Sequence, residues 1–245
     1  MKILLAPAET KRSGGDLSEI SKNSFIFEEL YEKRLEIITQ YEELLKRNSI
    51  EELSAWFGLK KESEVIRYQE SVLEKPGMKA IQRYTGVAFD YLGYDDLNEK
   101  EKNYCDTNVL LFSNLFGPIQ ASDIIPDYKF KQGAKLPNTV VEKFYKENFS
   151  AALDQYLGEE IIDLRAGFYD KFYTPKSPYV TMKFIKEGKV VSHWAKAYRG
   201  IVLKHLALNN IQTTQELMQM NIPNLHVQEI KKIKNKTEII YTIDT

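Results

Sequence analysis

The sequence predicts an α/β protein, a single compact domain with a mixed β-sheet surrounded by helices. Short runs of leucine and β-branched residues alternate with longer segments whose apolar residues recur every three or four positions, as strands and helices do. A short turn containing Gly188 joins two apolar runs and predicts a hairpin, so some strands are antiparallel. The 245 residues contain no linker, repeat or low-complexity segment, and we therefore expect one domain over residues 1–245.

The first element is a buried strand from Lys2 to Ala6, because an apolar run stops there at Pro7. Amphipathic spacing then predicts a long helix from Ser24 to Arg47. Asn48 and Ser49 offer caps for a short helix that Gly58 ends, and a third helical stretch stops before Pro76.

The rest of the chain continues the alternation of strands and helices. Pro137 and Gly158 mark the start and the end of one helix, and Gly188 marks the turn of the hairpin. The expected strands are 80–86, 109–113, 160–164, the hairpin 179–185 with 189–192, and the closing pair 225–230 and 238–243, joined by the lysine-rich turn 231–236. The expected helices are 137–157, 193–208 and 214–220.

Charge and hydropathy exclude several classes of function. Lys and Arg number 34 against 35 Asp and Glu, so the whole-molecule field does not attract DNA or an anionic membrane, and nucleic-acid binding would need a local patch. No stretch reaches about 18 uncharged apolar residues, and the N-terminus is too short in apolar residues for a signal peptide. We expect a cytoplasmic protein with no membrane contact and no obligate protein partner.

Metal and cofactor chemistry has little support in the residue types. Three histidines and one cysteine show no metal-ligand spacing, and neither Gly-x-Gly-x-x-Gly nor a Walker motif occurs, so we expect no metal and no cofactor. Cys105 has no partner for a disulfide and no positive neighbour to lower its pKa, and we predict that it is structural.

Two loops, one helix and the end of one strand hold the candidate functional residues. The loop after the first strand contains Glu9, Thr10, Lys11 and Arg12, and a rigid strand often positions such a loop. Glu9, Thr10 and Asp163 are candidates for catalysis, since general acid-base work needs groups at hydrogen-bond distance from a substrate. Capping or solubilising roles are the more common use of such acidic residues.

The helix expected at 193–208 would present a basic face. At about 100° per residue, His193 shares one arc with a set of candidate binding residues. This set is Lys196, Arg199, Gly200 and Lys204. Gly200 would let a phosphate approach the backbone, although a solvated charged face is the simpler interpretation. The loop from 123 to 136 adds Lys129, Lys131 and Lys135.

Several motifs resemble those of the peroxide stress protein YaaA family. Ala6-Pro7-Ala8-Glu9-Thr10 is similar to its Ser-Pro-Ala-Lys-Thr signature, and Lys196-Ala197-Tyr198-Arg199-Gly200 is similar to its Lys-x-x-Arg-Gly helix start. The matches between and around them are Tyr84-Thr85-Gly86, Tyr91-Leu92, Leu115-Phe116-Gly117, Asp123, Pro126-Asp127-Tyr128, Gly133, Asp163-Leu164, Tyr169 and Lys171. The resemblance runs from Met1 to about Leu217.

The resemblance implies a role in defence against hydrogen peroxide and iron-driven oxidative damage. It also implies similarity to proteins that bind duplex DNA with a helix-hairpin-helix element, which would fall at Leu111 to Asp123. Three positions depart from the family pattern: Glu9 replaces a lysine, Asn114 a glycine, and Gln120-Ala121 an Arg-Pro pair. Two positive charges are thereby missing, and Lys11 and Arg12 are local substitutes.

Two hypotheses follow. In the first, a stress protein binds duplex DNA through the face of Lys196 and Arg199 and the 129–135 loop. In the alternative, an enzyme of unknown reaction holds Glu9, Thr10, Asp163, Lys196 and Arg199 in one cleft. A long basic groove would favour a polymer, whereas an enclosed pocket would favour a small molecule.

Overall fold

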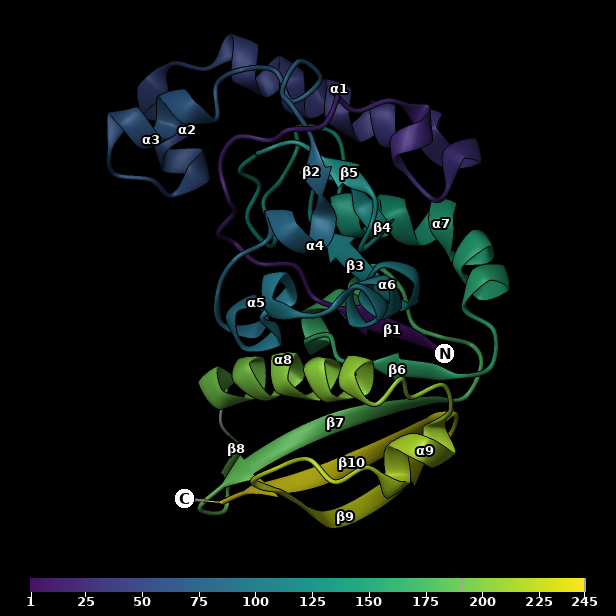
Figure 1. Ribbon diagram of the computed structural model, residues 1–245. Coiled ribbons are helices and arrows are strands. Elements are labelled where there is room, and N and C mark those ends of the chain that lie inside the picture. The colour runs from purple at the N-terminus through teal and green to yellow at the C-terminus, as the bar shows by residue number, and fades with distance from the viewer. Residues whose placement is uncertain (191, 245) are drawn as a thin grey trace.

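A mixed β-sheet forms the centre of the protein in the computed structural model, which describes residues 1–190 and 192–244 (Figure 1). The strands lie in the order β4-β3-β1-β6-β7-β10-β9, and β8 pairs with β7. Their bounds are β1 Lys2–Leu5, β3 Val109–Ser113, β4 Gly117–Gln120, β6 Ile161–Asp163, β7 Tyr179–Lys186, β8 Lys189–Val190, β9 Leu225–Ile233 and β10 Lys236–Ile243. A separate small sheet pairs β2, Met78–Lys79, with β5, Ile124–Ile125.

The middle of the sheet is parallel. β1 pairs in parallel with β3 on one side and with β6 on the other, so that Leu4 lies beside both Leu110 and Asp163. β6 with β7 and β7 with β10 are also parallel, whereas β4 and β9 join the sheet as antiparallel edge strands. The carboxyl ends of β3, β1 and β6 therefore meet at one edge of the sheet.

Helices pack around this sheet as the alternating sequence pattern predicts. Figure 1 shows α1 to α3 at one end of the molecule and α8 lying along β7 at the other end. The α-helices are α1 Tyr31–Arg47, α2 Ile50–Phe57, α3 Glu62–Arg67, α4 Ala80–Arg83, α5 Val87–Leu92, α6 Glu99–Asn108, α7 Val141–Leu157, α8 Ser192–Leu208 and α9 Thr214–Gln219. Short 3₁₀ turns are η1 Lys22–Ser24, η2 Glu28–Leu30, η3 Tyr94–Asp96 and η4 Gly167–Lys171.

Local signals in the sequence explain where several helices begin and end. Ser49 caps α2: its hydroxyl accepts the amide of Glu52 at 3.3 Å, and the Glu52 carboxylate accepts the amide of Ser49 at 2.8 Å. This reciprocal pair satisfies amides that the helix itself leaves free. Gly58 then ends α2 in the left-handed conformation, with φ 67°, where a side chain would be strained. Of the two predicted caps, Ser49 is confirmed, whereas the Asn48 side chain donates to the Leu44 carbonyl at the end of α1; the stop at Gly58 is confirmed.

Several predicted elements differ from the structure, and the helix expected at 137–157 begins only at Val141. The segment 80–86 is not a strand: it contains the short helix α4, whose first amides donate to the carbonyls of Asp123 and Ala121. A short apolar run is compatible with either structure, because length and not periodicity decides between them. The first long helix starts only at Tyr31, since Phe25 and Phe27 are buried in the irregular segment that precedes it.

The region expected to hold a helix-hairpin-helix element is a β-hairpin. Leu111 in β3 pairs with Ile119 in antiparallel β4, and Gly117 makes the turn with φ 69°. The Asp123 carboxylate fixes the following bend by accepting the amides of Gln120 and Ile26, at 2.9 and 3.1 Å. The helix-hairpin-helix prediction is therefore not confirmed at this place.

None of the helices that the structure describes combines the length and the apolar character needed to cross a membrane. At the C-terminal end, residues 231–233 continue β9, so the turn to β10 is shorter than predicted.

Candidate functional site

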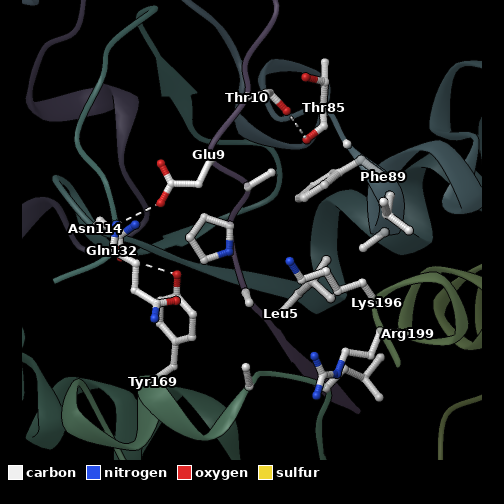
Figure 2. A pocket seen from close by; sticks show the side chains of 18 residues that line it. Leu5, Glu9, Thr10, Thr85, Phe89, Asn114, Gln132, Tyr169, Lys196 and Arg199 are labelled. Atoms are coloured by element: carbon white, nitrogen blue, oxygen red, sulfur yellow. Dashed lines mark hydrogen bonds between the residues drawn. The ribbon is translucent and has the colours of Figure 1, made fainter. Parts of the chain in front are cut away.

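A cavity of about 270 Å³ lies where β3, β1 and β6 end (Figure 2). Its floor is formed by the segment from Leu5 to Thr10, which leaves β1, by Asn114 after β3, and by Leu164 after β6. The chain goes from β1 first to β3 and later returns to β6 on the other side. Such a change of direction at the carboxyl ends of parallel strands is the usual ligand site of open α/β sheets.

The remaining walls come from distant parts of the sequence. The start of α5, from Thr85 to Phe89, covers one side, and α8 contributes Lys196 and Arg199. Gln132 and Tyr169 close the opposite side (Figure 2). The predicted proximity of Thr10 and Lys196 is confirmed, because both line this cavity.

Two glycines allow these walls to approach one another. Gly86 has φ 106°, and a Cβ there would lie 3.2 Å from the Thr10 hydroxyl, which itself donates to the carbonyl of Thr85 at 3.0 Å. Gly200 is buried where α8 crosses α5, and a Cβ there would lie 2.0 Å from the carbonyl oxygen of Ala88. Gly200 therefore serves helix packing, and no space remains beside it for a phosphate.

The cations of α8 give the cavity its charge. Lys196 is exposed, and Arg199 is partly buried. Burial lowers the pKa of Arg199, and the negative charge of Asp163 acts in the opposite direction. Across residues 1–190 and 192–244, the Arg199 side chain makes no hydrogen bond or ion pair. A partly desolvated guanidinium without a protein partner is well placed to bind an anionic group.

Glu9 fastens two loops together at the mouth of the cavity. One carboxylate oxygen accepts the amide of Gln132 at 2.9 Å, and the other lies 3.3 Å from Lys129 Nζ. Lys129 is therefore already paired with a carboxylate, in a largely buried position. Glu9 thus joins the first loop to the loop from 123 to 136.

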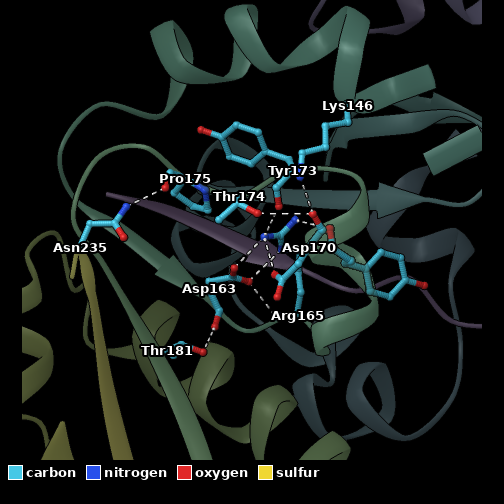
Figure 3. A network of polar contacts seen from close by, with 10 residues as sticks. Lys146, Asp163, Arg165, Asp170, Tyr173, Thr174, Pro175, Thr181 and Asn235 are labelled. Atoms are coloured by element: carbon cyan, nitrogen blue, oxygen red, sulfur yellow. Dashed lines mark hydrogen bonds and ion pairs between the residues drawn. The ribbon is translucent and has the colours of Figure 1, made fainter. Parts of the chain in front are cut away.

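Asp163 is held in a separate ion pair (Figure 3). Its two carboxylate oxygens accept Nε and Nη2 of Arg165 at 2.9 and 2.7 Å, and the Arg165 side chain is only 1% exposed. Arg165 also donates to the carbonyls of Tyr169 and Tyr173. Asp163 lines a neighbouring cavity of about 220 Å³, which Arg199 also borders, and not the one that holds Glu9 and Thr10.

The other candidate binding residues lie outside the lining of this cavity. Lys11 is buried, with Nζ 4.1 Å from the centre of the Tyr128 ring, and Arg12 pairs with Asp95 at 2.7 Å. The lysines that the structure does not bring to the cavity lining are Lys129, Lys131, Lys135 and Lys204. The side chain of His193 lies outside the described part of the structure.

The sequence did not identify Asn114, Gln132 or Phe89 as site residues. Asn114 directly follows the strand 109–113, so its position at a strand end was a usable signal. Its side-chain oxygen accepts the Tyr169 hydroxyl at 3.3 Å. Gln132 in its loop and Phe89 in α5 reach the cavity only through long-range folding, which no local pattern predicts.

The buried Lys11 should make stability depend on pH. Burial lowers its pKa to about 7, with Lys129 acting in the same direction and Glu9 and Asp127 opposing. The unfolded chain holds the Lys11 proton up to about pH 10.5, so the free energy of unfolding rises with pH between 7 and 10.5. We expect Lys11→Met to remove up to about 1.4 kcal/mol of this rise per pH unit. Urea unfolding at pH 7, 8 and 9 measures it.

Arg12→Met is the matched control, because Arg12 is the next residue but is exposed. Its pH slope should equal that of the wild type. Equal slopes for the wild type and Lys11→Met would show that the Lys11 amine keeps its proton in the fold.

The described part of the chain shows neither an exposed cysteine nor a cluster of metal-ligating side chains. Cys105 is buried, and burial raises its pKa to about 12, so the reactive thiolate is scarce at neutral pH. Within the described ranges, no three His, Cys, Asp or Glu side chains are grouped as metal ligands would be.

Fold and cavity together define an α/β protein with a candidate ligand site at a switch point of its parallel strands. The family model for "Peroxide stress protein YaaA" matches residues 1–231, and the chain belongs to this family. An uncharacterized protein of Campylobacter jejuni, Cj0984, is 49% identical over 245 residues, 99% of each chain. A UPF0246 protein of Corynebacterium glutamicum strain R is 32% identical over 90% of this chain and 91% of its own. Family membership supports a role related to peroxide stress.

Proposed function

We propose that this member of the peroxide stress family acts by binding one small anionic molecule in the cavity at the ends of β3, β1 and β6. The observation that carries the proposal is Arg199, a partly buried guanidinium at the cavity wall that lacks a partner in the described chain. The charge of Lys196 lies on the same wall. Together they offer an anion two cations and several N–H donors.

The size of the site favours a small molecule over a polymer. At about 270 Å³, the cavity lies just below the range of roughly 300–1,000 Å³ in which organic ligands bind. Three of the basic residues considered for DNA binding are otherwise engaged: Lys11 is buried, Arg12 pairs with Asp95, and Lys129 pairs with Glu9. These three side chains therefore do not support a continuous basic groove for DNA.

Binding has more support than catalysis. Both carboxylate oxygens of Glu9 are engaged by Gln132 and Lys129, and the Thr10 hydroxyl donates to a carbonyl. Asp163 is saturated by Arg165 and lies outside the lining. The alternative of an enzyme would need a proton acceptor at the cavity, and these candidates are held in structural contacts.

Phenyl phosphate, an anion on an apolar ring, is a suitable probe for calorimetric titration. We expect Arg199→Ala to weaken its binding by about 10- to 100-fold, the effect of losing a charge-assisted hydrogen bond of about 1.5–3 kcal/mol. Lys196→Ala should cost less, because an exposed charge is screened by solvent. Lys143→Ala, an exposed position on α7, is the control and should bind as the wild type does. Wild-type protein that binds no phenyl phosphate, or binds it independently of Arg199, would refute the proposal.

Duplex DNA is the second candidate ligand. Lys196 is exposed at the edge of the cavity, so it can contact a backbone phosphate of a duplex that stays outside the cavity. A labelled duplex is therefore a further arm of the same experiment, measured by fluorescence anisotropy against salt. When a protein binds the DNA backbone, log K falls as log salt concentration rises, with a slope of about −0.9 for each phosphate contacted. Lys196→Ala should remove one such contact and make the slope shallower by about 0.9. Absence of binding at low salt would remove this candidate.

A further inference from the structure

The cavity has different chemistry at its two ends. Figure 2 shows Lys196 and Arg199 on one side, and Asn114, Gln132 and Tyr169 on the opposite side. The first pair offers positive charge, whereas the second group offers neutral amide and hydroxyl groups beside the Glu9 carboxylate, which also lines the cavity. A ligand that uses both ends carries an anion at one end and a polar, hydrogen-bonding edge at the other.

Apolar surfaces lie between these ends. Leu5, Pro7 and Phe89 line the cavity together with small alanine side chains. The Phe89 ring is held in place by Tyr84, with ring centres 5.6 Å apart. Rigid flat surfaces of this kind favour a planar ring over a flexible chain, because a ring fills the space without losing rotamer freedom.

The Asn114 amide is oriented by the protein. Its Oδ1 accepts the Tyr169 hydroxyl at 3.3 Å, and the residue is only 6% exposed. Its Nδ2 group has no partner in the described part of the chain and can donate to an acceptor on the ligand. The exposed Gln132 side chain adds one more donor and one more acceptor. Nucleobases present such acceptors and donors along one planar edge.

We infer that the ligand is a nucleoside monophosphate, with its base against Pro7 and Phe89, the base edge toward Asn114 and Gln132, and the phosphate at Lys196 and Arg199. The inference rests on the proposed function and narrows it to one ligand class. Pockets for a single base combine apolar stacking with hydrogen bonds to the base edge in this way. The volume of about 270 Å³ is near the lower limit for organic ligands, so a single nucleotide fits the proposal better than a base pair does.

Calorimetric titration with four probes tests the ligand class: uridine 5′-monophosphate, uridine, ribose 5-phosphate and phenyl phosphate. We expect uridine monophosphate to bind at least about tenfold more tightly than any of the others, because it alone reaches both ends of the cavity. Arg199→Ala should weaken both uridine monophosphate and phenyl phosphate. Gln132→Ala should weaken uridine monophosphate about three- to tenfold and leave phenyl phosphate unchanged.

Asn114→Ala should give the same selective loss as Gln132→Ala. Because Asn114 is buried and holds Tyr169, its thermal unfolding is measured in parallel, and the exposed Gln132 provides the variant that keeps the native fold. Lys143→Ala again serves as the control and should leave all four affinities unchanged.

The outcomes separate this inference from the proposed function. Binding of phenyl phosphate that depends on Arg199, with uridine monophosphate no tighter, would overturn the nucleotide and leave the anion site standing. Absence of binding by both would refute the anion site as well. A uridine pentanucleotide tests whether the nucleotide belongs to a single strand. If the pentanucleotide displaces bound uridine monophosphate, the cavity accepts a nucleotide within a strand. If it does not, the cavity accepts only the free nucleotide.

Discussion

Asp163→Ala is expected to lower the free energy of unfolding by about 3–5 kcal/mol, the effect of removing one partner of a buried ion pair. Arg165 would keep its charge in a position that is 1% exposed, with the carbonyls of Tyr169 and Tyr173 left to accept its N–H groups. Its one remaining ion partner in the described chain would be the Asp170 carboxylate, which is exposed and lies 3.9 Å away, beyond hydrogen-bond distance. The guanidinium also lies 4.3 Å from the centre of the Phe112 ring, inside the apolar core. Urea unfolding at pH 7 measures the loss.

A second variant identifies the cause of this loss. In the double variant Asp163→Ala with Arg165→Met the buried charge is absent, and stability should recover by several kcal/mol relative to Asp163→Ala. Folded Asp163→Ala should still bind phenyl phosphate within a few-fold of the wild type. A small loss of stability together with abolished binding would instead place Asp163 in the ligand site, as the catalytic hypothesis for this residue required.

The parts of the site that belong to regular elements were predictable from the sequence. The strand from Lys2, its stop at Pro7 and the helix bearing Lys196 and Arg199 all follow from apolar spacing and proline, and the structure places them as expected. Loop residues are different. Thr10 lines the cavity, Lys11 is buried between aromatic rings, and Arg12 pairs with Asp95, although the three are consecutive.

Pairing between distant segments decides these different outcomes. Lys11 forms an isolated antiparallel bridge with Tyr84, and this contact turns its side chain inward. The basic character of the loop predicted exposed charge, because composition does not show which side chain a distant segment covers. Asp163 illustrates the same limit, since its partner Arg165 is two residues away but adopts a buried position only through the carbonyl of Tyr169 in η4 and that of Tyr173 after it.

Gly200 shows how one position couples packing to the site. Where α8 crosses α5, the Gly200 backbone lies against Ala88 and Tyr91 of α5. An added Cβ would be 2.0 Å from the Ala88 carbonyl oxygen and 3.1 Å from Tyr91 Cβ. The nearest obstacle is backbone, which cannot rotate away as a flexible side chain can. The two helices must therefore separate. Since α5 begins at the Gly86 wall of the cavity and α8 carries Lys196 and Arg199, that separation moves two adjacent walls of one site.

We therefore expect Gly200→Ala to reduce both stability and ligand binding. Overpacking costs about 1–3 kcal/mol, which exceeds the gain of about 1 kcal/mol that alanine brings to a helix. Displacement of Arg199 should weaken phenyl phosphate at least about tenfold. Urea unfolding and calorimetric titration measure the two effects, and Gly167→Ala is the matched control, because a Cβ there has no neighbour within 4 Å. A Gly200→Ala protein as stable as the wild type would show that α5 and α8 adjust to the methyl group. Unchanged phenyl phosphate binding would show that the cavity does not depend on how closely the two helices pack.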